Sequence, residues 1–197
     1  MNKIYYIYGT MYSGKSLDLI STYTTYKFHG KDVLVIKHAK DVRDGQAIKS
    51  RMSNTKVKCA RLTDDLSLHE LLALYMVDND FKYPDVIMID EVQFISENHV
   101  EELHAISKYC PIMCYGLKTT YTGELFPAIS KLLAIAEDVR EVKTTCRFCT
   151  KKATHNLLIR DGVPIYEGAY ENIEGQNPND EYVAVCREHF YSPGGHV

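Results

Sequence analysis

The chain has 197 residues, of which 45% are hydrophobic and 25% are charged, and its net charge is −3 at pH 7. This composition predicts a globular protein with one substantial core and a small second lobe. The negative charge argues against a surface that coats nucleic acid, and no run approaches the roughly 20 apolar residues that a membrane helix needs. A strand pattern stands where a signal peptide would begin, so we expect a cytoplasmic protein without nucleic-acid or membrane partners.

The first predicted strand, at residues 3–8, runs directly into a complete G-x-x-x-x-G-K-S motif. Apolar residues at helical spacing follow and predict a helix at 16–28. A strand, glycine loop and helix in this order direct backbone N–H groups at one point, where Lys15 adds charge and Ser16 can hold magnesium. The motif therefore predicts a triphosphate site, although a simple glycine turn is the alternative. The loop consists of Gly9, Thr10, Met11, Tyr12, Ser13, Gly14, Lys15 and Ser16.

Strand and helix patterns then alternate as far as about residue 142, which predicts a doubly wound α/β fold with a parallel sheet. The basic segment 41–61 has no sustained period and predicts a mobile loop or a hairpin. Gly30 is expected to end the first helix in a left-handed conformation, and Pro127 suits the first turn of the last helix. Further strands are predicted at 33–37, 86–90 and 111–117, and further helices at 66–77, 97–109 and 127–136.

The strand at 86–90 ends in two adjacent acids, Asp90 and Glu91. At the carboxyl end of a parallel strand, beside a phosphate loop, the first acid can bind magnesium and the second can act as a general base. Exposed loop acids are the alternative interpretation. The complete phosphate loop earlier in the chain favours the catalytic one.

Two pairs of metal-ligand residues lie near the C-terminus: Cys146 with Cys149, and Cys186 with His189. Two C-x-x-[C/H] pairs separated by a loop are typical of a tetrahedral zinc site. A disulfide is the alternative, but intracellular chains seldom keep one. Four protein ligands leave no open position for water, so a structural site is predicted.

Short strand patterns at 156–159, 163–166 and 182–185 surround these ligands. They predict a small zinc-binding lobe at residues 143–197 beside a phosphate-loop domain at 1–142. Cys59, Cys110 and Cys114 stand outside the metal pattern and are interpreted as buried small hydrophobic residues.

Taken together, the motifs resemble those of the zinc-containing, cellular-type (type II) thymidine kinases. The similarity rests on the phosphate loop, on Asp41-Val-Arg43, Asp90-Glu-Val-Gln-Phe94, Gly116-Leu117 and Gly123-Glu-Leu-Phe126, and on the four metal-ligand residues. It implies a RecA-like phosphate-loop domain, and a zinc-ribbon lobe carrying a lasso loop over the nucleoside. It also implies a homotetramer that transfers the γ-phosphate of ATP to the 5′-hydroxyl of thymidine with magnesium.

Residue by residue, the resemblance assigns ATP and magnesium to Lys15 and Ser16, and proton abstraction to Glu91. Asp41 and Arg43 match positions near the phosphoryl path, where a guanidinium can neutralise charge. The thymine pocket is matched by Met11, Leu117, Tyr121 and Phe126, and the lasso by Tyr170, Ile173 and Tyr182. Without the resemblance, the aromatic and aliphatic members of this set would be interpreted as ordinary core.

The chain departs from the family pattern in two places. Lys118 and Thr120 replace the arginine and aspartate that bacterial relatives commonly have, and Glu174 replaces a lasso glycine. Two other functions are alternatives: a RecA-like ATPase that holds nucleic acid with its zinc lobe, and a nucleotide sensor without turnover. The acidic zinc lobe disfavours the ATPase, and the presence of Lys15, Ser16, Asp90 and Glu91 together disfavours the sensor.

Overall fold

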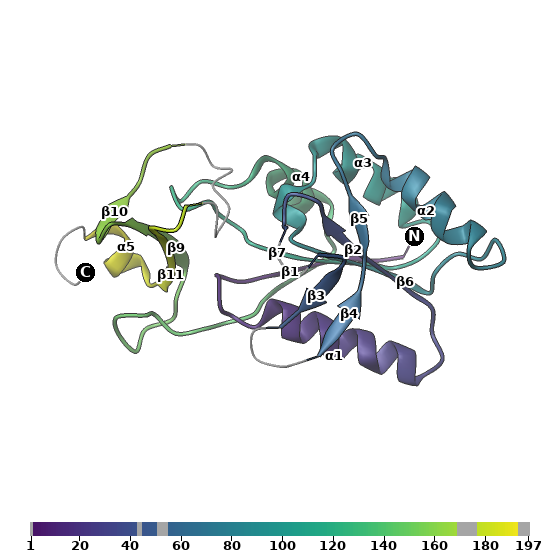
Figure 1. The fold of residues 1–197 in the computed structure, drawn as a ribbon, viewed down its shortest axis with the longest axis horizontal. Coiled ribbons are helices and arrows are strands. Elements are labelled where there is room, and N and C mark those ends of the chain that lie inside the picture. The colour runs from purple at the N-terminus through teal and green to yellow at the C-terminus, as the bar shows by residue number, and fades with distance from the viewer. Residues whose placement is uncertain (1, 43–44, 51–54, 169–176, 193–197) are drawn as a thin grey trace.

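The computed structural model describes residues 2–42, 45–50, 55–168 and 177–192, and a six-stranded sheet forms its centre (Figure 1). The strand order is β5-β2-β6-β7-β1-β8, and every neighbouring pair is parallel. The carboxyl ends of the strands therefore meet at one edge, as the predicted α/β fold requires. The strands are β1 (Ile4–Tyr8), β2 (Val33–His38), β5 (Ala60–Leu62), β6 (Val86–Asp90), β7 (Ile112–Gly116) and β8 (Asp138–Glu141).

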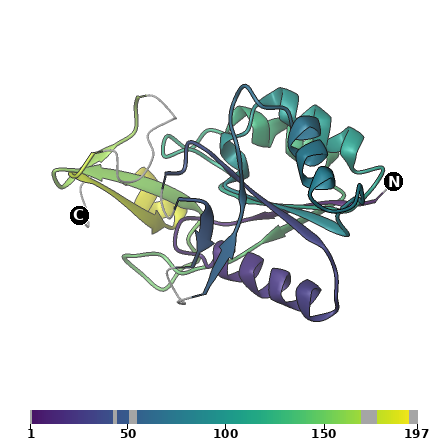
Figure 2. The ribbon, with the colours of Figure 1, turned by 45° about the vertical axis from the view of Figure 1, so that its right-hand side comes forward.

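Helices cover both faces of this sheet (Figures 1 and 2), which confirms the doubly wound arrangement. One core lies between the sheet and the helices α2 (Leu68–Val77), α3 (Glu97–Ile106) and α4 (Pro127–Ile135). The other lies under α1 (Lys15–Phe28), which contributes Leu19 and Ile20. Apolar residues at helical spacing give each helix one buried face.

Local capping signals explain where these helices begin and end. Ser67 and Ser96 each form a capping box with the residue three positions later, so α2 begins slightly later than its apolar pattern predicts. Gly30 has φ +71°, as expected for the residue that ends α1. Pro127 occupies the first turn of α4, as predicted.

The segment 41–61 contains the hairpin that was one of its two predicted forms. β3 (Ala47–Lys49) pairs antiparallel with β4 (Lys56–Lys58), and Ile48 and Val57 add to the core beneath α1. Two strands of the main sheet were not predicted. β5 has only three residues, and β8 is mostly exposed and charged, so neither has the apolar run that marks a buried strand.

The C-terminal lobe is built on a small antiparallel sheet, which lies at one end of the molecule (Figure 2). Its order is β10-β9-β11, with β9 at His155–Arg160, β10 at Val163–Ile165 and β11 at Asp180–Val185. The short helix α5 (Arg187–Tyr191) packs Phe190 against it. No helix within the described ranges is long and apolar enough to cross a membrane.

Candidate active site and metal centre

The phosphate loop lies between the end of β1 and the start of α1. Gly14 takes a left-handed conformation (φ 94°, ψ 14°) that turns the chain into the helix. The Nζ of Lys15 donates to the carbonyl oxygens of Gly9 at 3.1 Å and Thr10 at 2.8 Å, so this cation lies inside the loop. The buried hydroxyls of Thr10 and Ser13 have no hydrogen-bond partner among the described residues. A partly buried cation and unpaired buried donors in a glycine loop fit a phosphate group.

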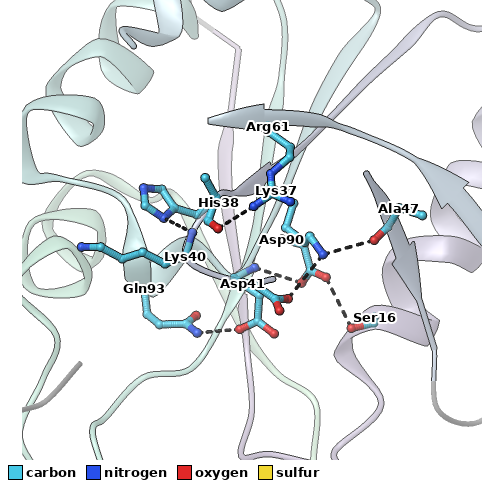
Figure 3. Close-up of polar contacts among 11 residues, drawn as sticks. Ser16, Lys37, His38, Lys40, Asp41, Ala47, Arg61, Asp90 and Gln93 are labelled. Atoms are coloured by element: carbon cyan, nitrogen blue, oxygen red, sulfur yellow. Dashed lines mark hydrogen bonds and ion pairs between the residues drawn. The ribbon is translucent and has the colours of Figure 1, made fainter. Parts of the chain in front are cut away.

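The acid at the end of β6 faces the start of α1 across the sheet edge (Figure 3). Ser16 Oγ donates to Asp90 Oδ2 at 3.4 Å, and the backbone N–H of Glu91 donates to Asp90 Oδ1 at 3.0 Å. Burial, and then the charge of Glu91, raise the pKa of Asp90 above its usual range. Hydroxyl and carboxylate oxygens are the ligands that magnesium prefers, so Ser16 and Asp90 together fit this ion.

Glu91 occupies a strained position directly after β6. Its backbone is left-handed (φ 53°, ψ 40°), which is rare for a residue with a Cβ and clusters at functional sites. The turn begins the 3-10 helix η1 (Val92–Phe94). Gln93 of that helix donates from Nε2 to Glu91 Oε2 at 2.5 Å. The geometry places a hydrogen-bonded carboxylate beside Asp90, as required of a general base near the phosphate loop.

Asp41 lies at the same edge, after the end of β2. It is 4% exposed, and its Oδ2 lies 3.6 Å from the Nζ of Lys37, which also donates to the carbonyl oxygen of Ala47 at 3.2 Å. Lys37 pairs with Asp90 in the β2–β6 register, so a buried cation stands among the acids. Sequence reasoning missed Lys37, whose only signal was a charged residue at the end of an apolar strand. Arg43, which the resemblance grouped with Asp41, lies outside the described residues.

Hydrogen bonds to and within the turn at 38–41 hold the backbone that carries Asp41 (Figure 3). The N–H of Asp41 donates to the carbonyl of His38 at 3.1 Å, and Arg61 donates to the carbonyl of Ala39 at 2.5 Å. The N–H of Lys40 donates to His38 Nδ1 at 3.2 Å. Residues from β2 and β5 therefore hold this loop against the sheet edge.

An apolar cluster lies where the phosphate loop meets the C-terminal lobe. Met11 packs with Tyr121 and Tyr182, whose rings are edge-to-face with centroids 6.4 Å apart. Leu158 and Ile165 of the C-terminal sheet complete it. The structure thus brings together three of the residues assigned to the nucleoside. The other two lasso residues, Tyr170 and Ile173, and the departure Glu174 lie outside the described residues.

Leu117 and Phe126, the two further residues matched to the thymine pocket, pack elsewhere. Both belong to the core between the sheet and the helices α2, α3 and α4. Phe126 is 4% exposed, and its ring packs edge-to-face on that of Phe94, with the ring centroids 6.2 Å apart. Their side chains contribute to the main core, whereas the Met11 cluster forms separately.

One buried amide joins the two lobes. Asn156 of β9 accepts a hydrogen bond from the backbone N–H of Met11 at 2.7 Å, and it is 3% exposed. Sequence reasoning missed Asn156. Its only signal was that it is a polar residue at the start of the apolar strand pattern at 156–159. Through this contact the C-terminal sheet holds the middle of the phosphate loop.

The residues that replace the family's arginine and aspartate have contacts of their own. Lys118 Nζ lies 5.3 Å from the centre of the Tyr8 ring, a cation–π distance. The hydroxyl of Thr120 lies 2.8 Å from that of Thr122, and it donates to the carbonyl of Glu124 at 3.3 Å. The two Thr120 contacts lie within the turn that carries Tyr121.

The four predicted metal ligands meet in the C-terminal lobe. Their ligand atoms lie within 4.8 Å of one another. Cys149 and Cys186 have sulfurs 3.8 Å apart, and His189 Nδ1 lies 3.4 Å from Cys146 Sγ and 3.3 Å from Cys186 Sγ. A tetrahedral zinc with normal bond lengths separates two sulfurs by about 3.8 Å, and a sulfur and a nitrogen by about 3.5 Å. The cluster fits zinc in both chemistry and spacing.

The remaining cysteines are buried and lie outside this cluster, as predicted. Burial raises the pKa of Cys110 to about 11 and that of Cys114 to about 12, and it also raises the pKa of Cys59. Thiols with raised pKa values are poor nucleophiles and poor metal ligands at neutral pH. They act as small hydrophobic side chains.

Comparison with known proteins gives matches along nearly the whole chain. A family described as "Thymidine kinase" matches residues 2–190, a range that includes both the phosphate loop and the metal ligands. The thymidine kinase of Streptococcus pyogenes serotype M3 is 34% identical over 195 residues, covering 98% of this chain and 99% of that protein. The thymidine kinase of Streptococcus gordonii is 35% identical, covering 98% of each chain. That of Streptococcus agalactiae is 33% identical, covering 98% and 99% respectively.

Proposed function

We propose that this chain, which belongs to the thymidine kinase family, transfers the γ-phosphate of ATP to the 5′-hydroxyl of thymidine at the carboxyl edge of its parallel sheet. Membership makes it a kinase, and its substrates are small molecules. The single observation that carries the proposal is the contact of Ser16, from the phosphate loop, with Asp90, which precedes Glu91. A phosphate site, an ion site and a base thereby lie next to one another.

The roles proposed for these residues follow from the chemistry of phosphoryl transfer. The loop N–H groups and Lys15 bind the ATP phosphates, and Lys15 exchanges its present carbonyl partners for phosphate oxygens. Glu91 takes the proton of the 5′-hydroxyl. The hydroxyl oxygen bonds to the γ-phosphorus, and ADP leaves. Magnesium held by Ser16 and Asp90 would neutralise developing charge on the phosphates. Asp41 and the buried Lys37 complete the polar rim of this site.

The nucleoside is proposed to bind at the Met11 cluster. Tyr121 and Tyr182, which are 3% and 6% exposed, supply the aromatic ring surfaces of this cluster, and Met11 lies in the phosphate loop itself. A pyrimidine that stacks on such surfaces would hold its 5′-hydroxyl toward the loop. The hydrogen bond from Tyr121 Oη to the carbonyl of Glu167, at 3.3 Å, ties this cluster to the chain before residue 169.

The decisive experiment is an assay of phosphate transfer from ATP to each of the four deoxynucleosides. We expect thymidine to be phosphorylated and the purine deoxynucleosides to react at least tenfold more slowly. ATP hydrolysis that produces no nucleotide and is stimulated by single-stranded DNA would contradict the proposal. That result would instead support the ATPase alternative.

We further propose that zinc fills the cluster formed by Cys146, Cys149, Cys186 and His189, and that it holds the nucleoside side of the site without joining the chemistry. Cys149 and Cys186 bracket the segment that contains Tyr182 of the Met11 cluster. Cys186→Ser should release about one zinc per chain, because structural zinc binds together with folding. The KM for thymidine should rise at least tenfold, and the KM for ATP should change much less.

Zinc content measured by elemental analysis, together with both KM values, tests this division of roles. Cys110→Ala is the matched control, since Cys110 is buried but lies outside the cluster, and it should keep its zinc. Protein purified without chelator that holds no zinc would contradict the proposal. So would unchanged thymidine kinetics after the metal is removed.

The division into a phosphate-loop domain at 1–142 and a zinc lobe at 143–197 is likewise proposed. Separate cores support it, because one apolar cluster of the C-terminal lobe contains only residues between Cys146 and Phe190. A homotetramer is proposed from the family resemblance, and the cytoplasmic location expected from the sequence is a proposal as well. Light scattering of the purified protein tests the tetramer, and cell fractionation tests the location.

A further inference from the structure

One buried amide stands between the proposed base and the neighbouring strand. Gln93 is 3% exposed, and the two ends of its side-chain amide contact different groups. Nε2 donates to Glu91 Oε2 at 2.5 Å (Figure 3), and Oε1 accepts from the backbone N–H of Leu117 at 3.0 Å. A single side chain therefore connects the residue after β6 to the residue after β7.

The two contacts fix which way the amide of Gln93 points. A backbone N–H can only donate, so the atom that faces Leu117 must be the amide oxygen. The NH2 group is then directed at the Glu91 carboxylate, to which it can donate. The reversed amide would place its oxygen against a carboxylate oxygen and its NH2 against an N–H. Both contacts of Gln93 thus favour the same orientation.

The absence of a side chain at Gly116 makes room for this amide. A Cβ at Gly116 would lie 2.5 Å from Gln93 Oε1 and 2.8 Å from a methyl carbon of Val92. Real Cβ contacts are almost never this short, so the last residue of β7 must be glycine for Gln93 to reach Leu117. The glycine of the Gly116-Leu117 motif and the glutamine of the Asp90–Phe94 motif therefore fit one another.

The residue whose N–H Gln93 contacts is also held through its carbonyl oxygen. The carbonyl of Leu117 accepts a hydrogen bond from the buried hydroxyl of Tyr6 at 2.8 Å. Leu117 begins the segment that leads to Tyr121 in the Met11 cluster. Gln93 consequently connects the Glu91 carboxylate to the backbone of Leu117, which Tyr6 also holds. Leu117 is the first residue of the segment that leads to Tyr121.

We infer that Gln93 is a positioning residue for Glu91, and this inference rests on the proposed role of Glu91 as the base. A glutamate side chain has three rotatable bonds, and a base that samples several orientations seldom meets the hydroxyl at the right distance. The hydrogen bond to Oε2 fixes the plane of the carboxylate relative to the phosphate loop. In this inference Gln93 acts through Glu91 and takes no direct part in the transfer.

The test is Gln93→Met, which keeps the length and volume of the side chain but removes both hydrogen bonds. We expect kcat to fall about tenfold or more, because misplacing a reacting group lowers the rate of the chemical step. The KM for ATP should stay within about twofold. In a Glu91→Gln background the same substitution should change kcat less than about twofold, because the base that Gln93 positions is already absent.

Tyr6→Phe is the matched control. It removes the hydrogen bond to the Leu117 carbonyl but changes neither the Glu91 nor the Gln93 contact. Both single variants should lower the unfolding temperature, whereas only Gln93→Met should lower kcat. If Gln93→Met does not fold, Gln93→Asn replaces it, since it keeps a neutral amide but is one CH2 shorter and cannot span from Leu117 to Glu91.

Two results would overturn the inference. One is a folded Gln93 variant whose kcat lies within twofold of wild type. The other is a Gln93→Met substitution that lowers kcat by the same factor in the wild-type protein and in the Glu91→Gln variant. The two residues would then act independently. If Glu91→Gln alone keeps most of its turnover, the proposed base itself is wrong and the role of Gln93 falls with it. The single Glu91 variant therefore separates the two failures.

Discussion

Glu91→Gln should lower turnover by about 100-fold or more while the affinity for ATP stays nearly unchanged. Positioned general bases contribute roughly 10²- to 10⁴-fold to the rate, and an amide cannot accept the proton of the 5′-hydroxyl. The fold should tolerate the change, because a glutamine oxygen can still accept the hydrogen bond from Gln93. Turnover at saturating substrates and ATP binding to the purified variant are the two measurements.

Glu101→Gln is the matched control for this prediction. Glu101 lies on α3, is exposed and pairs with Lys131 on α4, away from the sheet edge. Its replacement should leave turnover within twofold of wild type. Should the Glu91 variant keep more than about a third of the normal turnover, Glu91 is not the base.

The second large effect is expected from Lys15→Ala, which should abolish measurable transfer and weaken ATP binding. Lys15 is the only cationic side chain in the sequence from Gly9 to Ser16. Its removal takes away the positive charge that we propose faces the transferred phosphate. Transfer activity and ATP binding are to be measured together with circular dichroism, which shows whether the variant is folded.

Lys27→Ala provides the comparison on the same helix. Lys27 lies in the last turn of α1 and pairs with Asp32 on the surface, at 3.4 Å. Exposed pairs of this kind contribute about 0–1 kcal/mol, so this variant should behave like the wild type. A folded Lys15→Ala protein with normal kinetics would remove the basis for placing ATP at this loop.

The sequence alone predicted the parts of the protein that depend on short-range pattern. The phosphate loop is contiguous, the acids Asp90 and Glu91 follow directly on one apolar strand, and the metal ligands come as two close pairs. In each case the spacing along the chain already encodes the chemistry, because a loop, a strand end or a knuckle is formed by neighbouring residues. The alternation of strands and helices predicted the parallel α/β fold for the same reason.

Strands with a weak local signal could not be predicted. β8 is exposed and charged, yet it pairs with β1 because the edge of the sheet offers unpaired backbone groups. β5 has three residues and is held in the sheet by parallel backbone pairing with β2. Backbone pairing, which depends on the position of the partner strand, decided both.

The tertiary structure alone decided how the functional residues are supported. Lys37 reaches Asp41, Asn156 reaches Met11, and Gln93 connects Glu91 to Leu117. It also placed Phe126 in the main core, apart from the cluster of Met11 with Tyr121 and Tyr182.

The sequence thus determined which groups can perform the chemistry, because residue type and local spacing are known without the fold. Only the folded sheet decided which of them meet and what holds them in place. The ends of β2, β6 and β7 are distant in sequence and become neighbours at one edge through pairing between strands. Long-range hydrogen bonds form after such pairing, and no local pattern predicts them.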